Sequence, residues 1–333
     1  MSPRLDLFAV QAHVSAATYR SERAFGDAMA RLVDRCSALR APGVPALAVF
    51  PENVATFLAL APLGRLGRFM PSVSAATALS VLVRPLAFAR ALGRARPRRP
   101  EIAALLAVGP EVTRAYERTF AGLALQSQMT IVAGSALLPG EDGRVYNTSM
   151  TFGPDGWLEA RTRKVNLVWN VEDVLGLSAG RADELEIATT PAGRVGTLVC
   201  YDGFAVPHTA HEPGFRAVGA ALAERGAEVI ANPAANPWPW DGPWVHRAAG
   251  ASTLRREQWA AEGMRSQLAA MVGARYAVTA HLVGAILDQR FDGRSEILRR
   301  EPDGRVVTVA QAQRVDSEEI VHARVERAPE LAS

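Results

Sequence analysis

The stretch Arg194-Val-Gly-Thr-Leu-Val-Cys200-Tyr-Asp-Gly-Phe204 runs from an apolar segment into a cysteine and then into a turn. Its apolar and β-branched residues are typical of a short buried strand, and the glycine that follows the cysteine marks a turn. A strand that ends in this way brings a thiol to the edge of a sheet, where small-molecule sites commonly lie. Cys200 is therefore a candidate nucleophile.

Two other ionisable residues also end strand-like segments. Glu52 ends Ala46-Leu-Ala-Val-Phe-Pro-Glu52, and Lys164 ends Ala160-Arg-Thr-Arg-Lys164. An ordinary thiol, with a pKa of about 8.5, needs a base to become a nucleophile at neutral pH. A carboxylate can act as this base, and an ammonium can stabilise the oxyanion that forms on a carbonyl oxygen. The three side chains are sufficient for acyl transfer without histidine.

Strand-like and helix-like segments alternate along the chain, which predicts a layered α/β domain. We expect strands at residues 5–11, 46–50, 130–133, 146–152, 195–200, 229–231 and 276–282. We expect helices at residues 21–39, 110–128, 214–225 and 258–273. No repeat or linker divides the sequence, so we predict one domain over residues 1–333.

The order of three motifs resembles the nitrilase superfamily of carbon–nitrogen hydrolases, in its amidase-like branch. The motifs are Phe50-Pro-Glu52, Arg163-Lys164 and Cys200-Tyr-Asp202. Segments between and after them also resemble strands of that family, namely residues 131–135, 145–148, 229–233, 276–280 and 293–298. The resemblance implies a four-layer α-β-β-α sandwich with the reactive residues at one edge of its two sheets. It also implies a homo-oligomer.

The resemblance assigns a role to each reactive residue: Cys200 is the nucleophile, Glu52 the general base and Lys164 the oxyanion stabiliser. The family often has a further glutamate after the lysine. Here Glu172 follows Lys164 by eight positions, with Asp173 as an adjacent alternative. The candidate substrate-binding residues are Tyr201, Trp169, Asn232 and Tyr146. We predict no metal and no cofactor.

The expected activity is hydrolysis of a linear amide or carbamoyl compound through an acyl-cysteine. The alternatives are N-acyl transfer to an amine and nitrile hydrolysis. Tyr201 after the cysteine resembles amidase branches more than true nitrilases, which usually have tryptophan there. The arginine-containing turn of the ω-amidase pattern is missing from Gly203-Phe-Ala-Val206, so small dicarboxylate monoamides are not expected. We expect a small-molecule amide with an apolar portion.

Two rival sites were weighed around the same cysteine. Cys200, His208 and Asp202 have the residue types of a catalytic triad, but such a triad is recognised by geometry rather than by spacing. The run His208-Thr-Ala-His211-Glu212 has metal-ligand types, but it lacks a histidine pair at i, i+4. A polar loop is the better interpretation. The prolines and tryptophans of residues 236–244 predict either a structural lid or the mouth of an apolar pocket.

Residues 53–100 contain no aspartate or glutamate, whereas the net charge of the whole chain is +3. The arginines of this basic segment are Arg65, Arg68, Arg84, Arg90, Arg94, Arg96, Arg98 and Arg99. Four apolar residues fall at the spacing of one helical face: Leu79, Leu82, Val83 and Leu86. We therefore expect an extra basic helical insert at about residues 60–110. It is interpreted as a lid or subunit contact, or as a weak contact with a membrane surface. No nucleic-acid motif accompanies the charge, so no nucleic-acid partner is expected.

Composition is consistent with this interpretation. Hydrophobic residues make up 49% of the chain, and Cys36 and Cys200 are its only cysteines. Two cysteines predict no disulfide framework, and Cys36 is expected to be a small buried apolar residue. The first residues do not follow the order of a signal peptide, and no apolar run reaches the roughly 18 residues of a spanning helix. We therefore expect a cytoplasmic protein.

Overall fold

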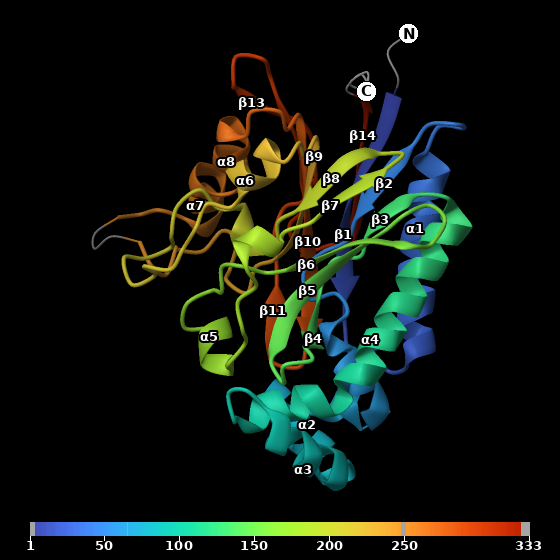
Figure 1. The fold of residues 1–333 in the computed structure, drawn as a ribbon, viewed down its shortest axis with the longest axis vertical. Coiled ribbons are helices and arrows are strands. Elements are labelled where there is room, and N and C mark those ends of the chain that lie inside the picture. The colour runs from blue at the N-terminus through green and yellow to red at the C-terminus, as the bar shows by residue number, and fades with distance from the viewer. Residues whose placement is uncertain (1–3, 65, 248–250, 328–333) are drawn as a thin grey trace.

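The computed structural model describes residues 4–64, 66–247 and 251–327 (Figure 1). The strands are β1 (Arg4–Val14), β2 (Ala46–Val49), β3 (Thr130–Val132), β4 (Ala136–Pro139), β5 (Val145–Phe152), β6 (Leu158–Arg163), β7 (Ile187–Thr190), β8 (Gly193–Thr197), β9 (Val229–Ala235), β10 (Tyr276–Ile286), β11 (Gln289–Phe291), β12 (Glu296–Arg300), β13 (Val306–Gln311) and β14 (Glu319–Glu326). The α-helices are α1 (Glu22–Leu39), α2 (Val73–Val83), α3 (Pro85–Arg94), α4 (Pro100–Ser127), α5 (Glu172–Leu175), α6 (Gly219–Glu224), α7 (Arg255–Glu262) and α8 (Met264–Ala270). The 3-10 helices are η1 (Thr56–Leu63), η2 (Gly67–Phe69), η3 (Ala182–Glu184) and η4 (Cys200–Gly203).

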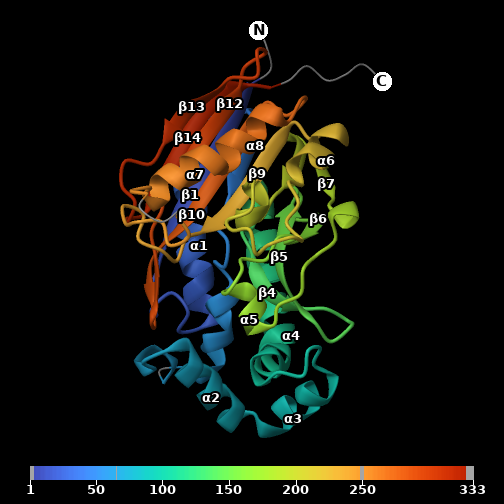
Figure 2. The ribbon, with the colours of Figure 1, turned by 90° about the vertical axis from the view of Figure 1, so that its left-hand side faces the viewer.

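Strand β1 belongs to both halves of a folded sheet. Its residues Asp6–Ala9 pair in parallel with β2, and its edge from Arg4 to Gln11 pairs antiparallel with β14. Beyond these, Ala12–Val14 pair in parallel with β10. The strands follow the order β4-β5-β3-β2-β1-β10-β9-β8-β7, so β1 and β10 join the two halves (Figure 2).

Alternate residues of β1 face two different cores. Phe8 and Val10 pack with α1 and α4, whereas Leu5 and Leu7 pack between the two halves of the sheet. A third core lies between the second half and helices α6 and α8, and includes Leu268. The order is therefore helices, sheet, sheet, helices, as the sequence predicted.

Helix α1 begins and ends close to the predicted residues. Ser21 is its N-cap, and its hydroxyl accepts a hydrogen bond of 3.1 Å from the amide of Ala24. One stripe of the helix is buried, and it consists of Phe25, Met29, Leu32, Val33 and Cys36. Cys36 is fully buried in this stripe, on the helix face that packs against the first half of the sheet.

Helix α4 starts ten residues before the predicted start, at Pro100 instead of Pro110. Proline lacks the N–H that a helix interior uses, so it is expected at the first residue of a helix rather than inside one. Here Pro110 lies inside the helix. The turns before it are fixed by Ile102 and Leu106, which are buried in a cluster with α3 and β5. Tertiary packing therefore outweighs the hydrogen bond that Pro110 cannot make.

The basic segment forms α2 and α3 at the end of the molecule opposite the termini (Figure 1). Pro85 is the first residue of α3, a position that proline favours. The two helices bend by 107° at this break. The predicted single face of Leu79, Leu82, Val83 and Leu86 is therefore wrong, because Leu86 lies on a different helix from the rest.

No single helix in the described part of the chain is both long and apolar enough to cross a membrane. Only α2 and α3 taken together reach the required length and composition, and they do so with the 107° bend between them.

The core between α4 and the first half of the sheet depends on Phe120. Its ring is fully buried and meets the rings of Phe50 at 5.0 Å and Tyr116 at 5.5 Å. We expect Phe120→Ala to reduce the free energy of unfolding by about 3–5 kcal/mol, through lost burial and a cavity. The control is Leu125→Ala on the same helix, because Leu125 is 57% exposed. Urea unfolding should show a change within about 0.5 kcal/mol for that variant, and an equal loss in both would contradict this packing.

Candidate active site

Cys200 lies just beyond β8, at the first residue of η4. The strand ends at Thr197, three residues before the predicted end. The backbone of Cys200 has a φ of +48°, in the left-handed region that side chains other than glycine seldom adopt. Strain of this kind, about 1–3 kcal/mol, is typical of functional residues that a turn holds in one orientation.

Asn232 of β9 holds this turn from behind. Its side-chain amide donates to the carbonyl oxygens of Leu198 at 2.7 Å and Cys200 at 3.3 Å. Asn232 is 1% exposed and is not among the residues that line the substrate-sized cavity described below. The structure therefore places this predicted substrate-binding residue behind the nucleophile.

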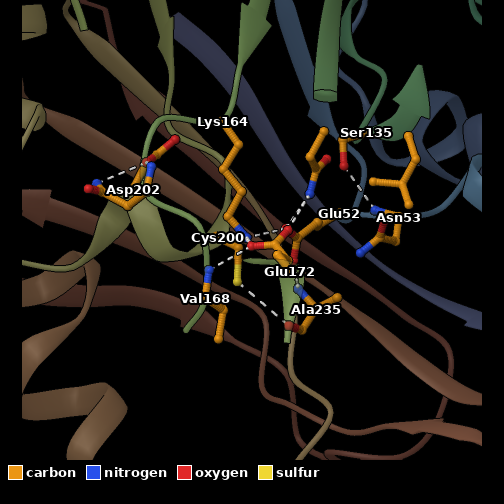
Figure 3. Close-up of polar contacts among 12 residues, drawn as sticks. Glu52, Asn53, Ser135, Lys164, Val168, Glu172, Cys200, Asp202 and Ala235 are labelled. Carbon is orange, nitrogen blue, oxygen red and sulfur yellow. Dashed lines mark hydrogen bonds and ion pairs between the residues drawn. The ribbon is translucent and has the colours of Figure 1, made fainter. Parts of the chain in front are cut away.

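Glu52 and Lys164 meet beside the thiol (Figure 3). Glu52 follows β2, Lys164 follows β6, and the ammonium lies 2.8 Å from Glu52 Oε1. The amide of Ala235, at the end of β9, donates to Glu52 Oε2 at 3.1 Å. The carbonyl of the same residue is the acceptor for the Cys200 thiol at 3.6 Å. Ala235 thus contacts both the expected base and the expected nucleophile.

Glu172 completes the charged group from the first residue of α5. Its Oε2 lies 2.7 Å from the Lys164 ammonium and accepts a hydrogen bond of 2.8 Å from the amide of Val168. Its side chain is 11% exposed, whereas Asp173 beside it lies at the surface. The structure thus brings Glu172, rather than Asp173, together with the three motif residues.

Asn147 joins the two glutamates, and the sequence interpretation missed it. Its side-chain amide donates to Glu52 Oε1 at 2.8 Å and to Glu172 Oε1 at 3.1 Å. The sequence singled out its neighbour Tyr146 instead. The hydroxyl of Tyr146 donates to Asp142 at 2.7 Å, away from the charged group. A polar residue inside a wholly buried strand was the available signal for Asn147.

Burial and charge act in opposition on these groups. Burial alone would lower the pKa of Lys164, but the carboxylates of Glu172 and Glu52 outweigh it and hold that pKa well above its ordinary value. Burial raises the pKa of Glu52, although the charge of Lys164 acts in the opposite direction. Burial also raises the pKa of the Cys200 thiol, and the negative charge of Glu52 adds to this effect. The resting thiol is therefore protonated beside a carboxylate that can accept its proton.

Asp202 positions the segment that follows Lys164. Its carboxylate accepts hydrogen bonds from the amides of Val165 at 3.0 Å and Asn166 at 2.7 Å, and from the side chain of Asn166 at 3.0 Å. A residue of the Cys200 turn thereby fixes the chain that carries the lysine.

Neither of the alternative sites around His208, the catalytic triad with Cys200 and Asp202 or the metal site, is formed in the structure. Its ring stacks on Tyr201 with 4.0 Å between centroids, and burial lowers its pKa. The Tyr201 hydroxyl donates to Glu212 at 2.8 Å and accepts from the His208 amide at 2.6 Å. Asp202 binds elsewhere, as described above. Residues 208–212 therefore form a polar loop packed on Tyr201, and within the described ranges no cluster of metal-ligand side chains is found.

A cavity of about 450 Å³ opens at the thiol. Its polar lining includes Glu52, Lys164, Glu172, Cys200 and Arg255, and its apolar lining includes Phe57, Val73, Leu137, Val168, Leu175, Phe204, Trp238 and Phe291. Tyr201 lines it as well, as predicted. Trp169 and Tyr146 are not among its lining residues. Trp169 instead stacks on His211, with 5.6 Å between ring centroids.

Two tryptophans of the proline-rich loop, Trp238 and Trp244, lie against Arg255, a residue that the sequence interpretation also missed. Trp238 lines the cavity, and Trp240 and Trp244 are buried beside it. The predicted helix at residues 258–273 is instead two helices that break at Gly263, and the first begins at Arg255. The late predicted start left this arginine outside the helix and outside the candidate site.

The carboxylate of Glu52 should control the acidity of the nucleophile. We expect Glu52→Gln to lower the pKa of the Cys200 thiol, because it removes one of the charges that raise it. The pH profile of Cys200 alkylation by iodoacetamide, followed by peptide mass spectrometry, should shift to lower pH. Cys36 is the internal control, since burial raises its pKa to about 12 far from Glu52. An unchanged or upward-shifted Cys200 profile would contradict this arrangement.

A model of the carbon-nitrogen hydrolase family matches residues 46–327 of this chain. Similar solved structures include a carbon-nitrogen hydrolase from Helicobacter pylori G27, with a TM-score of 0.63 at 18% identity, covering 97% of this chain and 89% of that chain. Nit3 of Saccharomyces cerevisiae, a member of branch 10 of the nitrilase superfamily, has a TM-score of 0.58 at 20% identity, covering 98% and 91%. An amidase from Nesterenkonia sp. AN1, solved as a double mutant with acrylamide, has a TM-score of 0.59 at 16% identity, covering 99% and 91%. These likenesses confirm the predicted fold.

Two curated relatives match a shorter stretch. The probable hydrolase YhcX of Bacillus subtilis (strain 168) is 28% identical over 123 residues, which is 37% of this chain and 21% of YhcX. The human omega-amidase NIT2 is 31% identical over 121 residues, which is 34% of this chain and 39% of NIT2. The match therefore spans less than half the length of either relative.

Proposed function

Because this chain belongs to the carbon-nitrogen hydrolase family, we propose that it is a thiol-dependent amidohydrolase that cleaves a linear, non-peptide amide. One observation carries the proposal: the thiol of Cys200, the carboxylate of Glu52 and the ammonium of Lys164 line one cavity and are buried together. These are the nucleophile, the proton acceptor and the fixed positive charge that amide cleavage requires.

In the first half of the reaction, Glu52 accepts the thiol proton while the sulfur of Cys200 bonds to the amide carbon. The negative charge moves onto the carbonyl oxygen, where the Lys164 ammonium stabilises it. The C–N bond then breaks, and Glu52 returns the proton to the leaving nitrogen. Ammonia or an amine departs, and the acyl group remains on Cys200. Ala235 contacts both the Cys200 thiol and the Glu52 carboxylate, which supports the placement of the proton acceptor beside the nucleophile.

In the second half, Glu52 accepts a proton from a water molecule that attacks the thioester carbon. Lys164 again stabilises the oxyanion. The C–S bond breaks, the thiolate takes the proton from Glu52, and a carboxylic acid is released. Glu172 holds the Lys164 ammonium and Asn147 holds the Glu52 carboxylate in place through both halves.

The cavity supports an apolar portion in the substrate. A second cavity, of about 230 Å³, shares lining residues with the first, including Phe57, Val73 and Leu137. Its further lining comes from α2 and α4 and includes Ala76, Ala104, Leu105 and Val108. Helix α2 therefore covers an apolar extension of the site, which fits the predicted lid.

We expect Cys200→Ala to abolish turnover and acyl-enzyme formation while the protein stays folded. The measurement is intact mass together with released ammonia, over a panel of short and long linear amides, carbamoyl compounds, nitriles and esters. The control is Cys36→Ala, because Cys36 lies on the buried face of α1 and is not among the residues that line the cavity. This control should retain activity.

Two outcomes would overturn this assignment. If Cys200→Ala kept full activity on a substrate of the wild type, the reaction could not pass through an acyl-cysteine intermediate. An adduct that clears only when an amine is added would replace hydrolysis with acyl transfer.

We also propose that the outer face of α2 and α3 makes a weak contact with an anionic lipid surface. Leu82 and Leu86 are 75% and 72% exposed, and the neighbouring Arg90 and Arg94 lie at the surface. The segment contains no acidic residue, so its charge is complementary to anionic headgroups.

The protein should float with vesicles that contain phosphatidylserine at low salt, and not with vesicles of phosphatidylcholine alone. Each basic residue near such a surface contributes about 1 kcal/mol, so Arg90→Glu with Arg94→Glu should weaken binding on the order of 10-fold or more. The control is Val272→Ser, an exposed apolar residue near α8. No flotation at low salt, or an oligomer that covers this face, would contradict the lipid contact.

A further inference from the structure

Arg255 is a buried cation in the wall of the cavity that contains Cys200. It is 2% exposed, and it is the first residue of α7. The N-terminus of a helix favours negative charge, so a cation at this position does not stabilise the helix. Another interaction must account for this arginine.

The guanidinium is held by two hydrogen bonds, which leave some of its N–H groups without an acceptor in the described part of the chain. Its Nε donates to Asn236 Oδ1 at 2.9 Å, and its Nη1 donates to Gln258 Oε1 at 2.5 Å. Nη2 makes no hydrogen bond to any of the residues that the structure describes. Both partners are buried, so the plane of the guanidinium is fixed. A fixed arginine with unused N–H groups suits a planar oxygen anion.

No carboxylate of the described ranges forms an ion pair with Arg255. The acid connected to it most directly is Glu262, which accepts a hydrogen bond of 2.5 Å from Gln258, so a neutral amide lies between the two charges. The rest of the surroundings are aromatic. The guanidinium carbon lies 4.2 Å from the ring centroid of Trp244 and 4.8 Å from that of Trp238.

Aromatic faces offset part of the cost of burying the cation. They do not replace an anion, because buried charges in proteins are normally paired. Burial lowers the pKa of Arg255 to about 9, so the guanidinium stays charged at neutral pH. An anion that enters the cavity would supply the missing partner.

Arg255 and the nucleophile are connected through adjacent residues of one loop. The Cys200 thiol contacts the carbonyl of Ala235, and the Arg255 guanidinium contacts the side chain of Asn236. Arg255 and Cys200 also line the same cavity, so a substrate that reacts at the thiol can extend to the guanidinium.

We propose that Arg255 binds a carboxylate of the substrate, so that the preferred substrates are linear amides that carry a carboxylate a few bonds from the scissile carbonyl. This inference rests on the proposed amidohydrolase function and specifies its substrate class. The inference replaces the expectation, drawn from the turn after Cys200, that dicarboxylate monoamides are not substrates. Arg255 then determines specificity, and the apolar lining holds the carbon chain between the two polar ends.

The first test compares turnover of paired probes. One series is ω-carbamoyl alkanoates of increasing length, together with N-acyl amino acids, and the other is the uncharged alkanamides of matching length. The wild type should prefer a carboxylated probe in kcat/KM. Arg255→Gln should reduce kcat/KM for that probe on the order of 10²-fold, the typical effect of truncating a buried charge pair. The value for the uncharged partner should fall by a smaller factor, because that probe has no carboxylate for Arg255 to bind.

The matched control is Arg256→Gln on the same helix. Arg256 is exposed and pairs with Asp241, outside the cavity. This variant should leave the ratio between the two probes unchanged. Arg255→Lys keeps the positive charge but loses the planar guanidinium. It should therefore retain part of the preference for the carboxylated probe that Arg255→Gln loses. A loss that is equal for both probes would show that Arg255 only holds the tryptophans, and would overturn the proposal.

The second test measures binding without turnover. Cys200→Ala protein is titrated with the same probes by calorimetry, with and without Arg255→Gln. Carboxylated probes should bind more tightly than uncharged ones only when Arg255 is present. If they do and the wild type hydrolyses nothing, the proposed function fails and the subsite stands. If the wild type hydrolyses uncharged amides and no probe responds to Arg255, the subsite fails and the function stands.

Discussion

The contact on which the site depends is the ammonium of Lys164 between two buried carboxylates. Its nitrogen lies 2.8 Å from Glu52 and 2.7 Å from Glu172, and all three groups are largely removed from water. Removing one member of such a group leaves an unpaired buried charge, which costs several kcal/mol. The elements that carry these three residues must therefore meet at one place. They are the end of β2, the loop after β6 and the start of α5. The side-chain amide of Asn147, from β5, binds both acids.

The folded sheet makes this convergence possible. Strand β1 pairs with β2 at one part of its length and with β10 at another, so the first half of the sheet brings Glu52 to the edge where the second half brings Cys200. Strand β9 connects the two, because Ala235 at its end contacts both residues. Asp202 then fixes the segment after Lys164 from the turn that carries the thiol. The strand or loop that carries one of these residues therefore also helps to position another of them.

The layered α/β fold was predictable from the alternation of strands and helices, and its four layers from the resemblance to the nitrilase superfamily. Glu52, Lys164 and Cys200 were predictable because each follows a recognisable strand within a short motif. Asn147 and Arg255 were not. Asn147 is one of several polar residues in β5, and the sequence does not show which of them meets the acids. Arg255 depends on the start of α7, which the sequence pattern placed at residue 258. The early start of α4 at Pro100 was missed for a related reason, since the packing of Ile102 and Leu106 is a tertiary effect.

The position of Lys164 between two acids has a consequence for the whole catalytic cycle. With Glu52 and Glu172 ionised and the thiol neutral, the group carries one net negative charge. In the proposed reaction this charge lies on sulfur after proton transfer and on oxygen in the tetrahedral intermediate, and it returns to Glu52 when the intermediate collapses. The total never changes, and the same ammonium faces the charge at every stage. Because no step of the proposed reaction requires the site to gain or lose a charge, the amide bond can be cleaved with little rearrangement of the surrounding dipoles.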